Sequence, residues 1–229
     1  MITVLIPTYR RPQLLARAVR SVLTQSERRV IVKVFDNASG DETKQVIANI
    51  SEADSRLYYH EHSENIGALA NFEYSFTQIT TPFFAVLSDD DYWLPGAFER
   101  ALNDLSRWPM AWMWAGLLLR VTDDGRIVDV RSSSWPESGI QNHEERFRLL
   151  TYRSVPIWTS CLFRTEALGA VGGLDASIGP QFDLNLIIRV GCGGSFILSH
   201  HPSAVFTLHR NSFGDSAPLS IHRDGWSAF

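Results

Sequence analysis

Residues 83–96 read FFAVLSDDDYWLPG, and this stretch decides the fold. The apolar run 83–87 predicts a strand buried in a parallel sheet, and it leads directly into three adjacent carboxylates, Asp89 to Asp91. Three like charges at one point are unfavourable unless a cation neutralises them, and a hard divalent cation bound through oxygens is a suitable partner. The alternative is an acidic turn that caps a helix beginning near Pro95.

Before this stretch, strands and helices alternate at short spacing, which predicts βαβ units and a mainly parallel sheet. The expected strands are 2–7, 30–35, 56–60 and 82–87, and the expected helices are 12–25, 41–50, one from the loop 63–67 to residue 78, and one over about 95–107. Each strand ends in polar residues. Because ligands bind beyond the carboxyl ends of such strands, we expect these residues to form a nucleotide-sized cleft.

After Arg107 the pattern changes. Two longer strands joined by a turn at 123–125 are followed by further helices and a closing strand segment. The expected elements are strands at 110–121, 127–131, 159–164 and 195–209, the last as one or two strands, and helices at 143–152, 182–190 and a brief one from residue 166.

The composition limits the partners and the location. A net charge of -4, from 21 basic and 25 acidic residues, gives no reason to expect nucleic acid. No apolar run approaches the roughly 20 residues needed to span a bilayer, although peripheral membrane contact stays open. Met1 leads directly into a strand without a signal-peptide pattern, and Cys161 and Cys192 suit two buried thiols in a reducing cytosol. We therefore expect a cytoplasmic protein.

Polar motifs recur along the chain in a fixed order, at 6–11, 36–39, 65–67, 88–91, 172–175, Asp183 and 209–210. This ordered set resembles the family-2 glycosyltransferases with the GT-A fold, an α/β fold whose nucleotide-binding, mainly parallel sheet is flanked by helices beside a smaller mixed sheet. The resemblance implies transfer of a sugar from a nucleotide diphosphate sugar, with inversion at the anomeric carbon and Mg²⁺ or Mn²⁺ as cofactor.

The first group of candidate residues concerns the nucleobase. Asp36, at a strand end, can accept a hydrogen bond from a base imino group, while Pro7, Thr8 and Tyr9 supply a wall and backbone contacts. Family members use the matching positions for uracil or thymine, so a UDP- or dTDP-sugar is the implied donor. The alternative for Asp36 is an Asx-turn that caps the following helix.

The next group concerns the phosphates and the donor sugar. Arg11, or its neighbour Arg10, can hold a phosphate, although either side chain could also simply be exposed at a helix start. Asn65 and Gly67 lie where the family places a loop near the nucleotide and the donor sugar. A turn that needs glycine explains Gly67 equally well.

The acidic cluster departs from the family pattern, because Ser88 replaces the first aspartate of the usual Asp-X-Asp-Asp. By resemblance, Asp90 contacts the ribose and Asp91 ligates the metal, with Asp89 as the alternative ligand. His209 resembles a later histidine that supplies a further metal ligand in some members, although a lone histidine is more often structural. The metal would neutralise charge on the departing diphosphate.

Asp183 is the candidate general base, because inversion requires a group that removes the acceptor's hydroxyl proton. It matches the aspartate of a Glu-Asp-X-Asp-Leu-like segment, in which Phe182 and Asn185 replace the other acids. A carboxylate near a metal and phosphates should stay ionised, as a base requires. The alternative is that Asp183 only caps its helix.

The sequence shows no linker, so we expect one GT-A domain over 1–229, with a nucleotide-sugar-binding half (1–107), an acceptor-side half (108–210) and a tail or lid (211–229). The acceptor is a glycan, a lipid-linked sugar or a small molecule, and the oligomeric state is open. Two other interpretations stand. One is a catalytically degenerate sugar-nucleotide-binding or scaffold protein; the other is a nucleotidyltransferase, disfavoured because residues 8–12 lack glycine.

Overall fold

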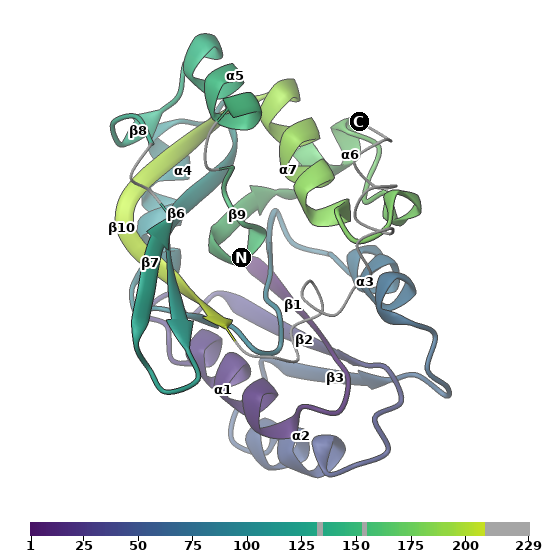
Figure 1. Cartoon of the computed structure of the whole chain (residues 1–229). Helices are drawn as coiled ribbons and strands as arrows, with labels where there is room; N and C mark the ends of the chain where they lie inside the picture. The colour runs from purple at the N-terminus through teal and green to yellow at the C-terminus, as the bar shows by residue number, and fades with distance from the viewer. Residues whose placement is uncertain (132–134, 153–154, 209–229) are drawn as a thin grey trace.

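The computed structural model describes residues 1–131, 135–152 and 155–208 (Figure 1). Its strands are β1 (Ile2–Thr8), β2 (Val30–Asp36), β3 (Leu57–Glu61), β4 (Phe83–Val86), β5 (Tyr92–Trp93), β6 (Ala111–Thr122), β7 (Ile127–Arg131), β8 (Gly139–Ile140), β9 (Cys161–Arg164) and β10 (Ser195–Leu208). Its helices are α1 (Pro12–Leu23), α2 (Thr43–Ser51), α3 (Ala68–Thr77), α4 (Ala97–Arg107), α5 (His143–Tyr152), α6 (Thr165–Ala170) and α7 (Phe182–Gly193), with short 3₁₀ turns η1 (Trp158–Ser160) and η2 (Ala176–Ile178).

These strands form one mixed sheet with the order β3-β2-β1-β4-β9-β6-β10-β5, to which β7 and β8 add at β6 and β10. The first four strands pair in parallel, and β6 also runs parallel to β10. Strand β9 pairs antiparallel with both β4 and β6, so it joins the two parallel regions. The prediction of an α/β fold with a mainly parallel sheet flanked by helices is confirmed. The strands expected to form a separate, smaller mixed sheet instead continue the same ten-stranded sheet.

Alternate side chains of the central strands serve two cores, one on each face of the sheet. In β1, Ile2, Val4 and Ile6 pack with helices α1, α2 and α4, whereas Leu5 faces the opposite core with α3, α5, α6 and α7. This period of two is the expected consequence of strand geometry. The sheet is therefore buried between two helical layers, and polar groups are left at the ends of the strands.

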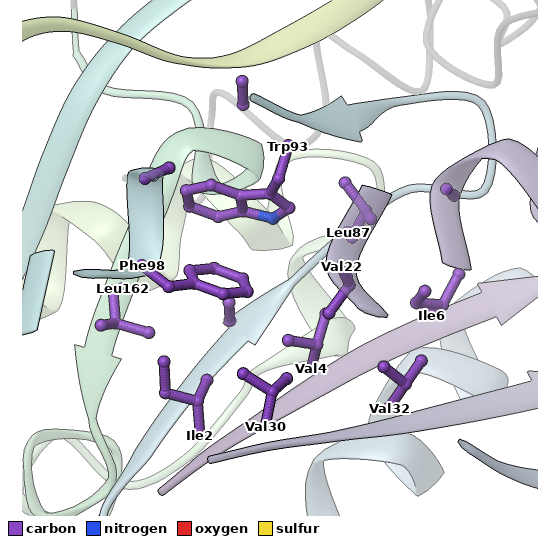
Figure 2. Close-up of a cluster of buried hydrophobic side chains, with 14 of the residues drawn as sticks. Ile2, Val4, Ile6, Val22, Val30, Val32, Leu87, Trp93, Phe98 and Leu162 are labelled. Carbon is purple, nitrogen blue, oxygen red and sulfur yellow. The ribbon is translucent and has the colours of Figure 1, made fainter. Parts of the chain in front are cut away.

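Figure 2 shows the first of these cores. Aliphatic side chains of β1 and β2 lie beneath Trp93 and Phe98, whose ring centroids are 4.6 Å apart. Leu87, the last residue of the apolar run, is also fully buried there. Residues 83–96 are thus anchored in the core by Leu87 before the three aspartates and by Trp93 after them, so those carboxylates are held in place.

The structure differs from the sequence expectation in several details. Tyr92–Trp93 and Gly139–Ile140 form two-residue strands that were not expected, because strands so short leave no periodic signal. The segment 195–208 is one continuous strand. Both cysteines lie in the described part of the chain and are free thiols, but Cys192 is exposed, so only Cys161 fits the expected buried thiol. Over the described residues, no helix has the length and apolar character needed to cross a membrane.

Candidate functional site

A cavity of about 420 Å³ opens beyond the carboxyl ends of β1, β2 and β4 and is closed on its other side by α3, η1 and the start of α7. Helices α3 and α7 lie on the same side of the sheet (Figure 1). The volume of this cavity is in the range of small-molecule and cofactor sites. The lining residues are Pro7, Thr8, Tyr9, Arg11, Asn37, Asn65, Ala68, Asn71, Phe72, Ser88, Asp89, Asp90, Ile157, Trp158, Pro180, Phe182, Asp183 and Phe206.

One wall of this cavity, the carboxylate wall, consists of Thr8, Arg11, Asp89 and Asp90. The Thr8 hydroxyl donates to Asp89 Oδ2 at 2.7 Å. Arg11 Nη1 donates to Asp89 Oδ1 at 3.0 Å and to Asp90 Oδ2 at 2.7 Å. Burial raises the pKa of Asp89 to about 6, against the lowering effect of Arg11. This wall is therefore a pair of desolvated carboxylates in contact with one guanidinium.

Asp91 has a different environment, and its placement differs from the expected one. It is fully buried and absent from the described lining of the cavity. Its Oδ2 accepts from the Thr159 hydroxyl and its Oδ1 accepts from the Thr207 backbone N–H, each at 2.9 Å. Burial raises its pKa, and the neighbouring Asp90 charge adds to the shift. Asp91 thus connects the acidic turn to η1 and β10.

Arg17 of α1 holds the same turn from outside the cavity. Its Nη2 donates to the Asp90 carbonyl and, at 2.8 Å, to the Thr207 hydroxyl. The guanidinium lies 4.7 Å from the Tyr92 ring centroid, a cation–π arrangement. The backbone of the acidic turn is therefore fixed independently of its carboxylates.

A second group of cavity residues consists of carboxamides. Asn37 Nδ2 donates to Asn65 Oδ1 at 2.8 Å, and Asn37 Oδ1 accepts from the Ile66 N–H at 2.8 Å. Asn71 Nδ2 donates to the Phe35 carbonyl at 2.9 Å. Two carboxamides that brace each other present oriented donors and acceptors to the cavity, a chemistry suited to the edge of a nucleobase.

Asp36, the expected base reader, lies just behind this group. Its Oδ1 accepts from the N–H and hydroxyl of Ser39, and its Oδ2 accepts from the Tyr59 hydroxyl at 2.6 Å. It is 1% exposed and is not part of the described cavity lining. Asp36 is therefore held in a local turn with Ser39 and does not cap α2, which begins at Thr43, and its neighbour Asn37 lines the cavity.

Two non-glycine residues next to this site have left-handed backbone conformations. Arg10 has φ +55° and Ala38 has φ +58°. The Arg10 N–H donates to Ser39 Oγ at 2.8 Å, which ties the loop after β1 to the loop after β2. Such conformations are unfavourable for residues with a Cβ and concentrate at functional sites, so they mark these strand ends as a place where geometry matters.

The opposite wall, the aromatic wall, consists of Phe72, Trp158 and Phe182. Their ring centroids are 5.1 Å apart for Phe72–Trp158, 5.1 Å for Phe72–Phe182 and 5.3 Å for Trp158–Phe182. Each comes from a different element, namely α3, η1 and α7. Rings that face a polar cavity offer flat apolar surfaces on which the C–H face of a sugar can stack.

Asp183 follows Phe182 at the first turn of α7 and also lines the cavity. Its Oδ1 accepts from the Leu184 N–H at 2.7 Å. Burial raises the pKa of Asp183, with this backbone hydrogen bond opposing the rise. Asp183 is therefore a desolvated carboxylate in the first turn of α7, whose N-cap residue is Gln181, and it lines the cavity without being the N-cap of its helix.

The remaining candidates lie elsewhere. Gly67, with φ +85° directly before α3, lines a neighbouring hollow and not this cavity, and its backbone fits the turn that needs glycine. His209 and the segment 211–229 lie outside the described residues. Within the described ranges, no group of three histidine, cysteine or acidic side chains is arranged to hold a metal ion. Two carboxylates at the cavity, Asp89 and Asp90, are oxygen donors that would suit Mg²⁺ or Mn²⁺ when phosphates complete the shell.

Sequence reasoning missed several lining residues. Asn37 lies in the segment 36–39, but the contact to the base was assigned to Asp36. Asn71, Phe72 and Phe206 lie in elements that contain no recognised motif. The signal for Phe72 was weak, because an aromatic residue at helical spacing usually indicates core. Only tertiary packing shows that it faces a cavity.

The model of glycosyl transferase family 2 matches residues 3–172 of this chain. The chain belongs to this family. The predicted family resemblance is thereby confirmed, and the match includes the carboxylate wall. Asp183 and the rest of α7 lie beyond the matched residues.

The curated relatives are similar over part of their length. A GalNAc(5)-diNAcBac-PP-undecaprenol beta-1,3-glucosyltransferase of Campylobacter jejuni is 32% identical over 103 residues, which cover 44% of this chain and 33% of the relative. A putative teichuronic acid biosynthesis glycosyltransferase, TuaG of Bacillus subtilis, is 25% identical over 129 residues, which cover 56% of this chain and 51% of the relative. This chain spans about a third of the length of the first of these.

Solved structures share the fold at low identity. TarS 1-349 of S. aureus, in complex with UDP-GlcNAc, has a TM-score of 0.75 and 16% identity, covering 97% of this chain and 64% of that one. A mannosyltransferase of Pyrobaculum calidifontis, in complex with GDP-Man and Mn2+, has a TM-score of 0.65 and 17% identity, covering 93% and 58%. The expected GT-A fold is confirmed.

Proposed function

We propose that this chain transfers a sugar from a UDP- or dTDP-sugar to an acceptor hydroxyl with inversion at the anomeric carbon. The observation that carries this proposal is one cavity lined by both the strand-end aspartates 89 and 90 and by Asp183, which comes from a helix of the other half of the chain. Family membership supports the reaction class. The solved relative with UDP-GlcNAc supports a nucleotide-sugar donor.

The donor's nucleoside would lie against β1 and β2. Pro7, Thr8 and Tyr9 line this side, and Asn37 braced by Asn65 offers an acceptor for a base N–H and a donor for a base carbonyl. Asp36 acts behind them in this proposal, because its hydrogen bonds to Ser39 and Tyr59 shape the loop that carries Asn37. Uracil and thymine present this N–H and C=O pair.

The diphosphate would lie against the carboxylate wall. Arg11 supplies a cationic fork for phosphate oxygens. Asp89 and Asp90 would hold a divalent cation, which when bound neutralises charge on the leaving diphosphate. We prefer Asp89 and Asp90 to Asp91 as its protein ligands because both line the cavity, whereas Asp91 is fully buried outside its described lining. In this proposal Asp91 keeps the acidic turn in place.

Asp183 would act as the general base. Its carboxylate takes the proton of the acceptor hydroxyl, the acceptor oxygen forms a bond to the anomeric carbon, and the bond from that carbon to the diphosphate oxygen breaks with its electron pair on the diphosphate. Burial raises the pKa of Asp183, which makes its carboxylate a stronger base than that of an exposed aspartate.

The acceptor would approach along the aromatic wall. Phe72, Trp158 and Phe182 border the side of the cavity that also holds Asp183. We propose residues 1–107 as the donor half and 108–210 as the acceptor half, with Gly67 shaping the loop before α3 within the donor half. The relatives named for an undecaprenol-linked and a teichuronic acid product support a glycan or lipid-linked acceptor as the first classes to test.

The test is a two-stage screen. Calorimetry with UDP, dTDP, GDP and ADP, each with and without Mn²⁺, should show Mn²⁺-dependent binding of UDP or dTDP. A panel of the matching nucleotide sugars should then show slow metal-dependent hydrolysis of one donor, which identifies the sugar without the acceptor. Absence of binding by every nucleotide would refute the proposed function.

A further inference from the structure

Arg11 bridges the two carboxylates, Asp89 and Asp90, that would hold the metal ion in the proposed function. Its guanidinium Nη1 lies 3.0 Å from Asp89 Oδ1 and 2.7 Å from Asp90 Oδ2. The Arg11 side chain is 25% exposed, whereas the two carboxylates are 8% and 11% exposed. One nitrogen therefore bridges two mostly buried carboxylates, and the partly exposed Arg11 side chain lines the cavity.

A divalent cation cannot approach those two oxygens while the guanidinium is in contact with them. Charge-assisted hydrogen bonds are among the stronger polar interactions in a protein, and they strengthen when the pair is desolvated. Displacing Arg11 therefore opposes metal binding in the free protein. A second partner for the guanidinium would remove that opposition, and the diphosphate of the donor is a partner of suitable charge and geometry.

We propose that Arg11 is an internal counter-ion that competes with the divalent cation for Asp89 and Asp90 until the donor diphosphate draws the guanidinium away. The release of Arg11 by the donor diphosphate rests on the proposed function. The competition itself rests only on the contacts of Arg11. The arrangement makes metal and nucleotide binding mutually supportive, and by linkage each ligand must tighten the other by the same factor.

Arg10 provides a matched control. It is the neighbouring arginine and carries the same charge, but its Nε donates to the Ser39 carbonyl and its guanidinium lies over the Tyr9 ring at 5.0 Å. A substitution Arg10→Gln thus changes the net charge as Arg11→Gln does without removing the contacts to Asp89 and Asp90. Differences between the two variants isolate the bridging contact.

The experiment measures Mn²⁺ binding from the free-ion signal in electron paramagnetic resonance, at pH 8, with no nucleotide present. Arg11→Gln should bind Mn²⁺ at least about tenfold more tightly than the wild type, since a charge-assisted pair of this kind typically contributes that much or more. Arg10→Gln should stay within about threefold of the wild type. Equal Mn²⁺ affinities in the two variants would overturn the competition. Circular dichroism melting shows whether each variant is folded, and Arg11→Lys, which keeps the charge without the fork, should fall between wild type and Arg11→Gln.

The same titrations are then repeated with saturating UDP. In the wild type, UDP should tighten Mn²⁺ binding by at least about tenfold, and in Arg11→Gln this enhancement should shrink, because the phosphate no longer relieves a competitor. An undiminished enhancement in Arg11→Gln contradicts the exchange while the proposed function stands. Absence of UDP binding in the wild type refutes the proposed function and the exchange together, but leaves the Mn²⁺ comparison without nucleotide as an independent result.

Discussion

The two walls of the cavity solve different physical problems. The carboxylate wall, from the ends of β1 and β4, holds two desolvated negative charges beside a guanidinium. The aromatic wall, from α3, η1 and α7, is made of three rings that contact one another. One carboxylate, Asp183, lines the cavity next to it. The first wall suits a charged ligand and the second suits the apolar face of a sugar.

This difference indicates a division of labour within the proposed transferase. The carboxylate wall would bind the charged diphosphate of the leaving group. Asp183, beside the aromatic wall, would be available for proton transfer. Even adjacent aspartates differ in their surroundings, because Asp90 lines the cavity whereas Asp91 is enclosed by hydrogen bonds from Thr159 and Thr207. The predictions below test whether the walls are separable in this way.

The largest effect is expected at the aromatic wall's carboxylate. Asp183→Asn should lower turnover by about 10³-fold, because proton transfer by a positioned base contributes roughly that much. Nucleotide affinity should change by less than about threefold, since Asp183 makes none of the described contacts to Thr8, Arg11, Asp89 or Asp90. Steady-state kinetics with the donor found in the screen, together with calorimetry, make the measurement.

Asp175→Asn is the matched control for that substitution. Asp175 directly precedes η2 in the same half of the chain, and its side chain accepts from Ser177 outside the described lining of the cavity. Its turnover should equal that of the wild type. Unchanged turnover in Asp183→Asn would remove Asp183 from the catalytic role.

The next effect concerns the desolvated carboxylate of Asp89. Its pKa in the folded protein is raised by burial from 3.8 to about 6, so the folded state binds this proton more tightly than the unfolded state does. Its contribution to stability is therefore full below the unfolded pKa and is lost as the pH rises from about 4 to about 6. Relative to Asp89→Asn, the wild type should lose about 3 kcal/mol of unfolding free energy over this interval. Urea unfolding at several pH values measures it, and a difference that stays constant from pH 4 to 7 would contradict the desolvation of Asp89.

A smaller effect separates Asp91 from its neighbours. Asp91→Ala leaves the Thr207 N–H and the Thr159 hydroxyl without their acceptor and should cost about 2 kcal/mol of unfolding free energy. Asp91→Asn, which can still accept and donate there, should cost less. In both variants the folded protein should keep its Mn²⁺ affinity. A loss of Mn²⁺ binding in Asp91→Asn with stability unchanged would instead make Asp91 the metal ligand.

The smallest effect concerns base recognition. Asn37→Ala removes one carboxamide from the cavity and should weaken UDP binding by about tenfold, because one or two hydrogen bonds are lost. Binding of inorganic pyrophosphate, which has no base, should be unaffected. If both ligands weaken equally, Asn37 supports the loop and does not read the base.

Much of the first wall could be predicted from the sequence, and less of the second. The apolar run 83–87 followed by Asp89 and Asp90 predicts, by local rules alone, that these carboxylates lie at a strand end. Parallel pairing of β1 with β4 then brings Thr8 and Arg11 beside them. Local rules do not say which way a side chain turns. Asp36 and Asp91 were expected at the ligand, but each is enclosed by hydrogen bonds to partners distant from its motif, Tyr59 and Thr207 respectively.

The aromatic wall was harder because its rings come from elements far apart in the chain. Phe72, for example, gave no local signal that distinguished it from a core residue. Phe182 was read only as a departure from an acidic motif, whereas it packs against Trp158 at 5.3 Å and lines the cavity. Such a surface is determined by tertiary packing, which pattern rules do not contain.

The central claim is that the cavity at the strand ends binds a nucleotide diphosphate with a divalent cation held by the carboxylate wall. Calorimetric titration of UDP into the wild type and into Asp90→Asn, with and without Mn²⁺, tests it most directly. The wild type should bind UDP at least about tenfold more tightly with Mn²⁺ than without it, and Asp90→Asn should lose that enhancement while remaining folded. Equal enhancement in Asp90→Asn, or no UDP binding by the wild type, would contradict the account.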